Sequence, residues 1–167
     1  ERVYPSVNLM VTTTDMGGPE CSTSRPSGYV PQRGAPVQTG CNARLARFTG
    51  LVSGPTDTPV VLEEACTQVC PVAVVPDAPF LHFDAWGSNV ANDAVSEALS
   101  CLGPQGIDGC GYEAPLEAMM QAINPQSCWN DPSACEPFSR ESWGSGFLRP
   151  DAVLAVAVVT DEADCSV

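Results

Sequence analysis

The chain has 167 residues, a length that suits one domain with a single hydrophobic core. It carries 20 Asp and Glu against seven Arg and no Lys, so its net charge is −13. Such a surface repels nucleic acid and anionic lipid and favours cations such as Ca²⁺. No apolar run is long enough to span a membrane, and the first residues do not form a signal peptide.

Nine Cys beside a single His point to an oxidising compartment. Zinc sites need CxxC-type pairs, and the closest string, Cys66 to Cys70, is an isolated CxxxC. We therefore expect disulfides and an extracellular or cell-surface location. Proximity in the sequence predicts the bridges Cys21–Cys41, Cys101–Cys110 and Cys128–Cys135.

Three cysteines remain after that assignment, namely Cys66, Cys70 and Cys165. Either two of them pair and leave one thiol, or Cys165 pairs with a residue beyond position 167. Connectivity cannot be fixed from spacing alone, so both alternatives stay open.

The first half of the chain predicts short strands separated by loops. The β-branched run over 6–14 predicts a buried strand that stops at Asp15, and the Gly- and Pro-rich residues 17–46 predict a loop bracketed by Cys21 and Cys41. Short strands are expected over 47–52 and 79–84. Residues 60–69 are ambiguous, because their centre favours helix and their flanks favour strand.

The second half predicts two helices and a long strand. Apolar spacing predicts a helix over 90–102 and a second one that begins after Gly111 and ends at Asn124. The second helix has Pro115 in its first turn and Leu116, Met119, Met120 and Ile123 as its apolar face. After a Pro- and Ser-rich loop over 124–150, the unbroken apolar run over 152–160 predicts a central strand covered on both faces.

Acidic residues follow the two apolar strands, with Asp15 after the first and Asp161 and Glu162 after the last. If those strands run parallel, their carboxyl ends meet at one edge of the sheet, where ligands bind in open α/β sheets. Carboxylate oxygens are the ligands of Ca²⁺ and Mg²⁺. The sequence therefore predicts a divalent-cation site at this edge.

Three stretches carry a family resemblance: VNLMVTTTDMG over 7–17 followed by Cys21 and Cys41, GCGYEAPLEAMMQAI over 109–123, and GFLRPDAVLAVAVVTDEADCS over 146–166. They resemble von Willebrand A-like domains of the disulfide-bearing type found in myxobacterial surface proteins and lipoproteins. The resemblance implies an α/β, Rossmann-like fold: a central, mostly parallel sheet flanked by helices, with long disulfide-pinned loops. It implies a single domain over residues 1–167 that lacks the first strand and helix. Either the domain is truncated at its N-terminus, as a fragment of a longer protein, or it is a reduced version without that segment.

The resemblance also implies a metal-ion-dependent adhesion site. Asp161 matches the family's Asp after the fourth strand, and Glu113 falls where the family has a Thr. The family's Asp-x-Ser-x-Ser loop has no counterpart in this sequence. The nearest string is Asp131-Pro-Ser133-Ala-Cys135, which follows no predicted strand. The candidate metal ligands are Asp161, Glu113, Asp15, Glu162 and Asp164.

Each candidate also has a plain structural interpretation. Asp161, Glu162 and Asp164 also fit a solvated turn. Glu113 fits a residue in the first turn of a helix, where the helix dipole favours a negative charge. Asp15 fits a residue that closes its own turn. His82 fits a packing residue with satisfied hydrogen bonds. Trp86, Trp129 and Trp143 fit loop anchors better than binding aromatics.

These observations favour an extracellular, non-enzymatic adhesion or binding module for a protein or glycan partner, with Ca²⁺ or Mg²⁺ as the candidate cation. The alternative is a structural subunit of an extracellular fibre or matrix that assembles through an open sheet edge. A secreted hydrolase is least favoured, because the chain has one His, no Gly-x-Ser-x-Gly or HExxH motif, and no two carboxylates placed for glycoside hydrolysis.

Overall fold

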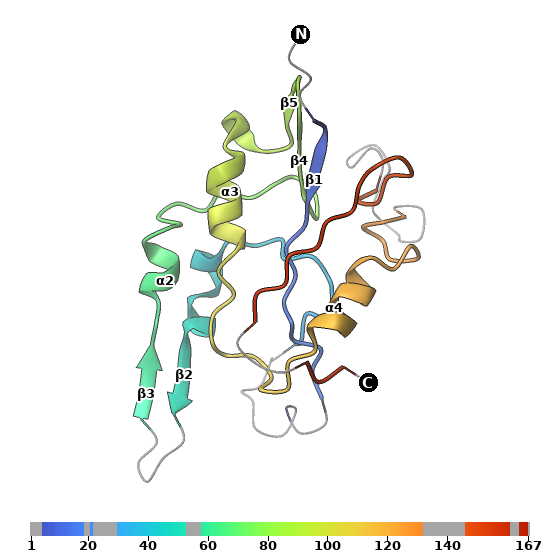
Figure 1. Cartoon of the computed structure of the whole chain (residues 1–167). Helices are drawn as coiled ribbons and strands as arrows, with labels where there is room; N and C mark the ends of the chain where they lie inside the picture. The colour runs from blue at the N-terminus through green and yellow to red at the C-terminus, as the bar shows by residue number, and fades with distance from the viewer. Residues whose placement is uncertain are drawn as a thin grey trace. The chain divides into compact units, whose positions relative to one another are not determined.

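The computed structural model describes residues 5–18, 21, 30–52, 58–131, 146–160 and 164–166 (Figure 1). Predictions that concern Cys135, Trp143, Asp161 and Glu162 lie outside these residues. The chain forms two compact units. Unit 1 comprises Glu1–Val11 and Gln38–Gly109, and unit 2 comprises Thr12–Val37 and Cys110–Val167.

The sheets of the described chain are antiparallel, so the predicted parallel α/β sheet is wrong. In unit 1, β1 (Val7–Leu9) pairs with β4 (Leu81–Asp84), with Asn8 opposite His82, and β4 pairs with β5 (Gly87–Ser88). The strand expected over 6–14 is thus limited to three residues, whereas the strand expected over 79–84 is present. The predicted strand over 152–160 is absent, because those residues pair with no strand in the described chain.

A second sheet of unit 1 is a hairpin of β2 (Thr49–Val52) and β3 (Thr58–Val61). Pro59 lies opposite Leu51, and a proline is tolerated here because both strands of a two-stranded sheet are edges. The helix α2 (Glu64–Thr67) follows β3. The ambiguous residues 60–69 are therefore strand first and helix afterwards.

Disulfides occupy the centre of unit 1. The bridges Cys41–Cys66 and Cys70–Cys101 join the 3₁₀ helix η1 (Cys41–Phe48), α2 and the helix α3 (Val95–Leu102). Their four cysteines form one buried cluster with Phe48. The short 3₁₀ helix η2 (Ala91–Asp93) precedes α3, so the helix predicted over 90–102 is present but begins later.

Backbone contacts hold the end of η1 to the loop after α3. The carbonyl oxygen of Arg47 accepts hydrogen bonds from Ile107 N (2.7 Å) and Asp108 N (2.9 Å). A Cβ at Gly106 would overlap that same carbonyl, and Gly106 has a φ of +92°, so glycine is required there. Arg44 donates to Gln105 Oε1 at 3.1 Å, and burial, followed by the nearby Arg47, lowers its pKa.

Unit 2 is organised around the helix α4 (Pro115–Ala122), which has Pro115 in its first turn as predicted. The buried side chains of the helix are Pro115, Ala118 and Ala122. The predicted apolar face is thus wrong in part, because Leu116 and Met120 are exposed. Small residues face the interior because the chain packs closely on that side of α4.

The presence of disulfides is confirmed, but two predicted pairings are wrong. Cys21 bonds to Cys110, 89 residues away, rather than to Cys41. Cys101 bonds to Cys70 rather than to Cys110. Each of these bridges instead lies within one unit: Cys21 and Cys110 both belong to unit 2, and Cys70 and Cys101 both belong to unit 1. Cys128 is also disulfide-bonded, and its predicted partner Cys135 is outside the described residues.

We predict that the double variant Cys70→Ala/Cys101→Ala is less stable by about 3–4 kcal/mol, since the lost bridge closes a loop of 31 residues. Denaturant unfolding measures this change. The control Ser100→Ala, on the exposed side of α3, should stay within about 0.5 kcal/mol. Peptide mapping without reduction should join Cys70 to Cys101, and a peptide joining Cys101 to Cys110 would contradict the structure.

Candidate functional site

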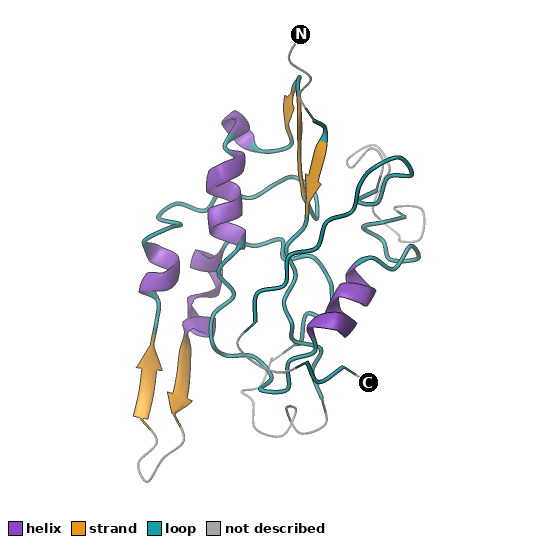
Figure 2. Cartoon of the chain, in the orientation of Figure 1, coloured by secondary structure: helices purple, strands orange, loops and turns teal. Residues whose placement is uncertain are grey.

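The most unusual feature of unit 2 is an extended stretch that pairs with no strand in the described part of the chain. We call residues 153–159 the open segment; Figure 2 colours it as loop and Figure 1 shows its extended path. None of these residues forms a hydrogen bond with another described residue. Its sequence, VLAVAVV, is made entirely of apolar residues. Strand-forming residues with an unpaired backbone are a template for another strand.

The exposures of the open segment alternate as they do along a β-strand. Val153 and Val159 are 95% and 92% exposed, whereas Leu154, Val156 and Val158 are 47–49% exposed. Successive side chains of a strand point to opposite faces, so the half-covered residues share one face and the bare residues share the other. The open segment therefore has the alternating exposure of a strand, without a strand partner among the described residues.

The N-terminal end of the open segment is tied to the loop after α4. Phe147 N donates to the carbonyl oxygen of Trp129 at 2.7 Å, and a Cβ at Gly146 would overlap the carbonyl of Asn130. Trp129 Nε1 and Asn130 Nδ2 both donate to Ala122 O, in the last turn of α4, at 2.7 and 3.0 Å. This end is thus connected to the C-terminal end of the helix.

The C-terminal end of the open segment is tied to the start of α4. Thr160 Oγ1 donates to Glu113 Oε2 at 2.6 Å, and Cys165 N donates to Glu113 O at 2.7 Å. The chain is therefore bonded to residues that flank α4 on both sides of the open segment, at Phe147 before it and at Thr160 directly after it.

Residues 164–166 also cap α4. The N-cap residue, Ala114, has no side chain that could accept a hydrogen bond from the first turn. Instead, Asp164 Oδ1 accepts from Leu116 N at 3.2 Å, and Ser166 Oγ accepts from Glu117 N at 2.8 Å. Ser166 Oγ also donates to Asp164 Oδ1 at 2.8 Å. A negative charge is favourable at this end of a helix.

Two of the predicted metal ligands, Glu113 and Asp164, therefore meet at the start of α4, where each has one carboxylate oxygen accepting hydrogen bonds. Asp15 closes its own turn, because its Oδ1 accepts from Gly17 N at 2.9 Å, and the adjacent Thr14 O accepts from Ala114 N. In the described part of the chain, no group of three His, Cys, Asp or Glu is placed to hold a metal ion. Metal binding stays a prediction.

The remaining singled-out residues lie elsewhere. His82 has its Nδ1 2.7 Å from Asn8 Oδ1, so it has the hydrogen-bonded environment that was expected. Trp129 is a loop anchor through its bond to Ala122, as expected. Trp86 is not an anchor: it is 91% exposed in the turn between β4 and β5. The capping role of Ser166 was missed, because no local pattern links a tail to a helix 49 residues earlier.

We predict that Asp164→Ala lowers the free energy of unfolding by about 1 kcal/mol, because Leu116 N loses its acceptor. Asp164→Asn keeps an acceptor oxygen and should lose much less. Thermal or denaturant unfolding of the two variants measures the difference. Equal losses in both would show that Asp164 does not act as a hydrogen-bonding cap.

The predicted cation site can be tested by calorimetric titration. If these carboxylates hold an ion, Ca²⁺ or Mg²⁺ must give a binding heat and raise the unfolding temperature, since ligands that bind the folded state stabilise it. Glu113→Gln should then weaken binding, because it removes a charged ligand. No heat and no shift with either ion would remove the divalent-cation prediction.

Comparison with protein-family models, with curated proteins and with solved structures found no match for this chain. Among the described residues, no helix is long and apolar enough to cross a membrane. The feature with chemical consequence is the open segment, fastened at both ends to α4.

Proposed function

We propose that this chain is an extracellular, non-enzymatic binding module that engages a partner protein by strand addition at the open segment. The observation that carries the proposal is the run of apolar residues, 153–159, that makes no hydrogen bond with the described chain. An added strand supplies main-chain hydrogen bonds for affinity and side-chain contacts for specificity. This mode of binding supports a non-catalytic, adhesive role.

Burial gives the driving force for this mode of binding. Val153 and Val159 are almost wholly exposed, and covering a valine side chain contributes on the order of 1.5 kcal/mol or more. The backbone adds hydrogen bonds worth about 1 kcal/mol each. The anchored ends reduce the ordering cost, so a modest length of strand is enough for a specific complex.

The extracellular location rests on the disulfides. The bridges Cys21–Cys110, Cys41–Cys66 and Cys70–Cys101, together with the bonded Cys128, involve seven of the nine cysteines, which is the pattern of an oxidising compartment. This supports an encounter with partners outside the cell. The disulfides also make each unit rigid enough to present a strand without unfolding.

We predict a two-residue periodicity in hydrogen exchange upon binding. The probe is a neutral peptide of alternating Val and Thr with Ser-Gly at both ends, and the readout is amide exchange of the whole chain. In an edge strand only every second N–H points toward an added strand, so slower exchange should appear at alternate residues of 153–159. Uniform slowing, or none, would contradict strand addition.

A pair of proline variants provides the matched control. Proline removes one N–H, which matters only where that N–H faces the added strand. Of Ala155→Pro and Val156→Pro, the variant at a protected amide should bind the neutral peptide roughly tenfold more weakly, and the other should bind nearly as wild type. Unfolding should be unchanged in both. Identical binding by both variants would contradict the pairing.

A further inference from the structure

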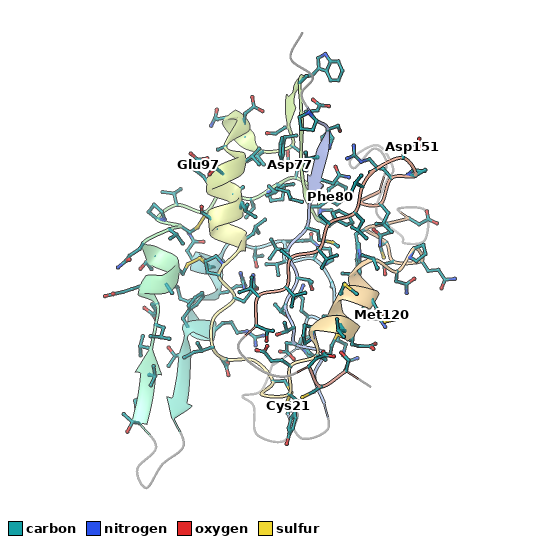
Figure 3. All side chains as sticks on the ribbon, in the orientation of Figure 1. Cys21, Asp77, Phe80, Glu97, Met120 and Asp151 are labelled. Carbon is teal, nitrogen blue, oxygen red and sulfur yellow. A yellow bond between two sulfur atoms is a disulfide. The ribbon has the colours of Figure 1, made fainter. Side chains whose placement is uncertain are left out.

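Acidic residues lie near each end of the open segment, one before it and two after it. Asp151 is exposed in the turn before it, where Figure 3 labels its side chain. Glu113 and Asp164 lie at its other end, where Glu113 accepts the hydrogen bond from Thr160. Arg149 is the single cation in the stretch over 146–166. A bound strand would therefore meet an apolar middle between acidic ends.

We propose that the strand bound here belongs to a different protein and consists of an apolar stretch flanked by Lys or Arg. This inference rests on the proposed function and specifies its partner. Cations at the two ends of the added strand would lie near Asp151 on one side and near Glu113 and Asp164 on the other. Complementary charge of this kind speeds association and fixes register.

A second copy of the chain is the competing occupant, and its charge disfavours it. Each copy carries a net charge of −13. In a parallel, in-register pair, Asp151 would stack on Asp151, and in an antiparallel pair centred on Val156 it would lie opposite residue 161, which is also an Asp. Like charges directly opposite destabilise a strand pair. A two-stranded ribbon would also leave its apolar faces uncovered.

The test compares two peptides with the same Val-Thr core, one flanked by two Lys and the other by two Glu at each end. Calorimetry at about 20 mM salt should give roughly tenfold tighter binding of the Lys-flanked peptide, and the ratio should approach one at about 500 mM, where exposed charges are screened. A Lys-flanked peptide with two central prolines keeps the charge but cannot pair, so it should not bind.

Matched charge variants locate the effect. Asp151→Asn should reduce the preference for the Lys-flanked peptide about two- to threefold, because one end loses its carboxylate. Asp77→Asn removes the same charge from an exposed position of unit 1 and should leave the preference unchanged. Equal effects of the two variants would mean that only net charge matters and would overturn the inference.

The outcomes separate this inference from the proposed function. If the Lys-, Glu- and Ser-Gly-flanked peptides all bind equally well, strand addition stands and the charged partner is wrong. If none of them binds, strand addition itself fails. If sedimentation shows the chain alone self-associating more strongly as salt rises, the occupant is a second copy, and the inference of a different protein is overturned.

Discussion

The structure depends on the ties between helix α4 and the two ends of the open segment. Glu113 receives one hydrogen bond from the side chain of Thr160 and another from the backbone of Cys165. Asp164 and Ser166 then complete the first turn of the helix, whose own N-cap residue is an alanine. Without these bonds the apolar residues 153–159 would be an unordered chain, and burying them against a partner would cost far more entropy.

Two further properties of the chain are its disulfide-bonded core in unit 1 and its acidity. In unit 1, four cysteines and Phe48 form the buried cluster that holds η1, α2 and α3 together. A covalent centre compensates for a small apolar core. The net charge of −13 opposes association of this chain with a second copy, and in the proposed complex it would favour a basic partner.

Local patterns in the sequence predicted local structure. They did not predict pairing between residues that are far apart in the sequence. Pro115 at the start of α4 and the strand at 81–84 could be predicted because their signals lie within a few residues. The bridge from Cys21 to Cys110 could not, because it depends on how the fold separates cysteines that are close in sequence. Residues 152–160 were expected inside a parallel sheet because an apolar run needs cover on both faces. The described chain supplies no neighbouring strand for these residues, so they stay exposed instead of forming a core strand.

The fastening of residues 153–159 at two places has a mechanical consequence. In the proposed complex, tension applied through a bound strand would reach α4 at both of its termini, through Trp129 and Asn130 at one and through Glu113 at the other. Because the force would be divided between these two attachments, the contact with the bound strand would not open from one end. Two attachment points would therefore help the proposed complex to resist pulling. A strand attached at one point only would lose its hydrogen bonds one after another.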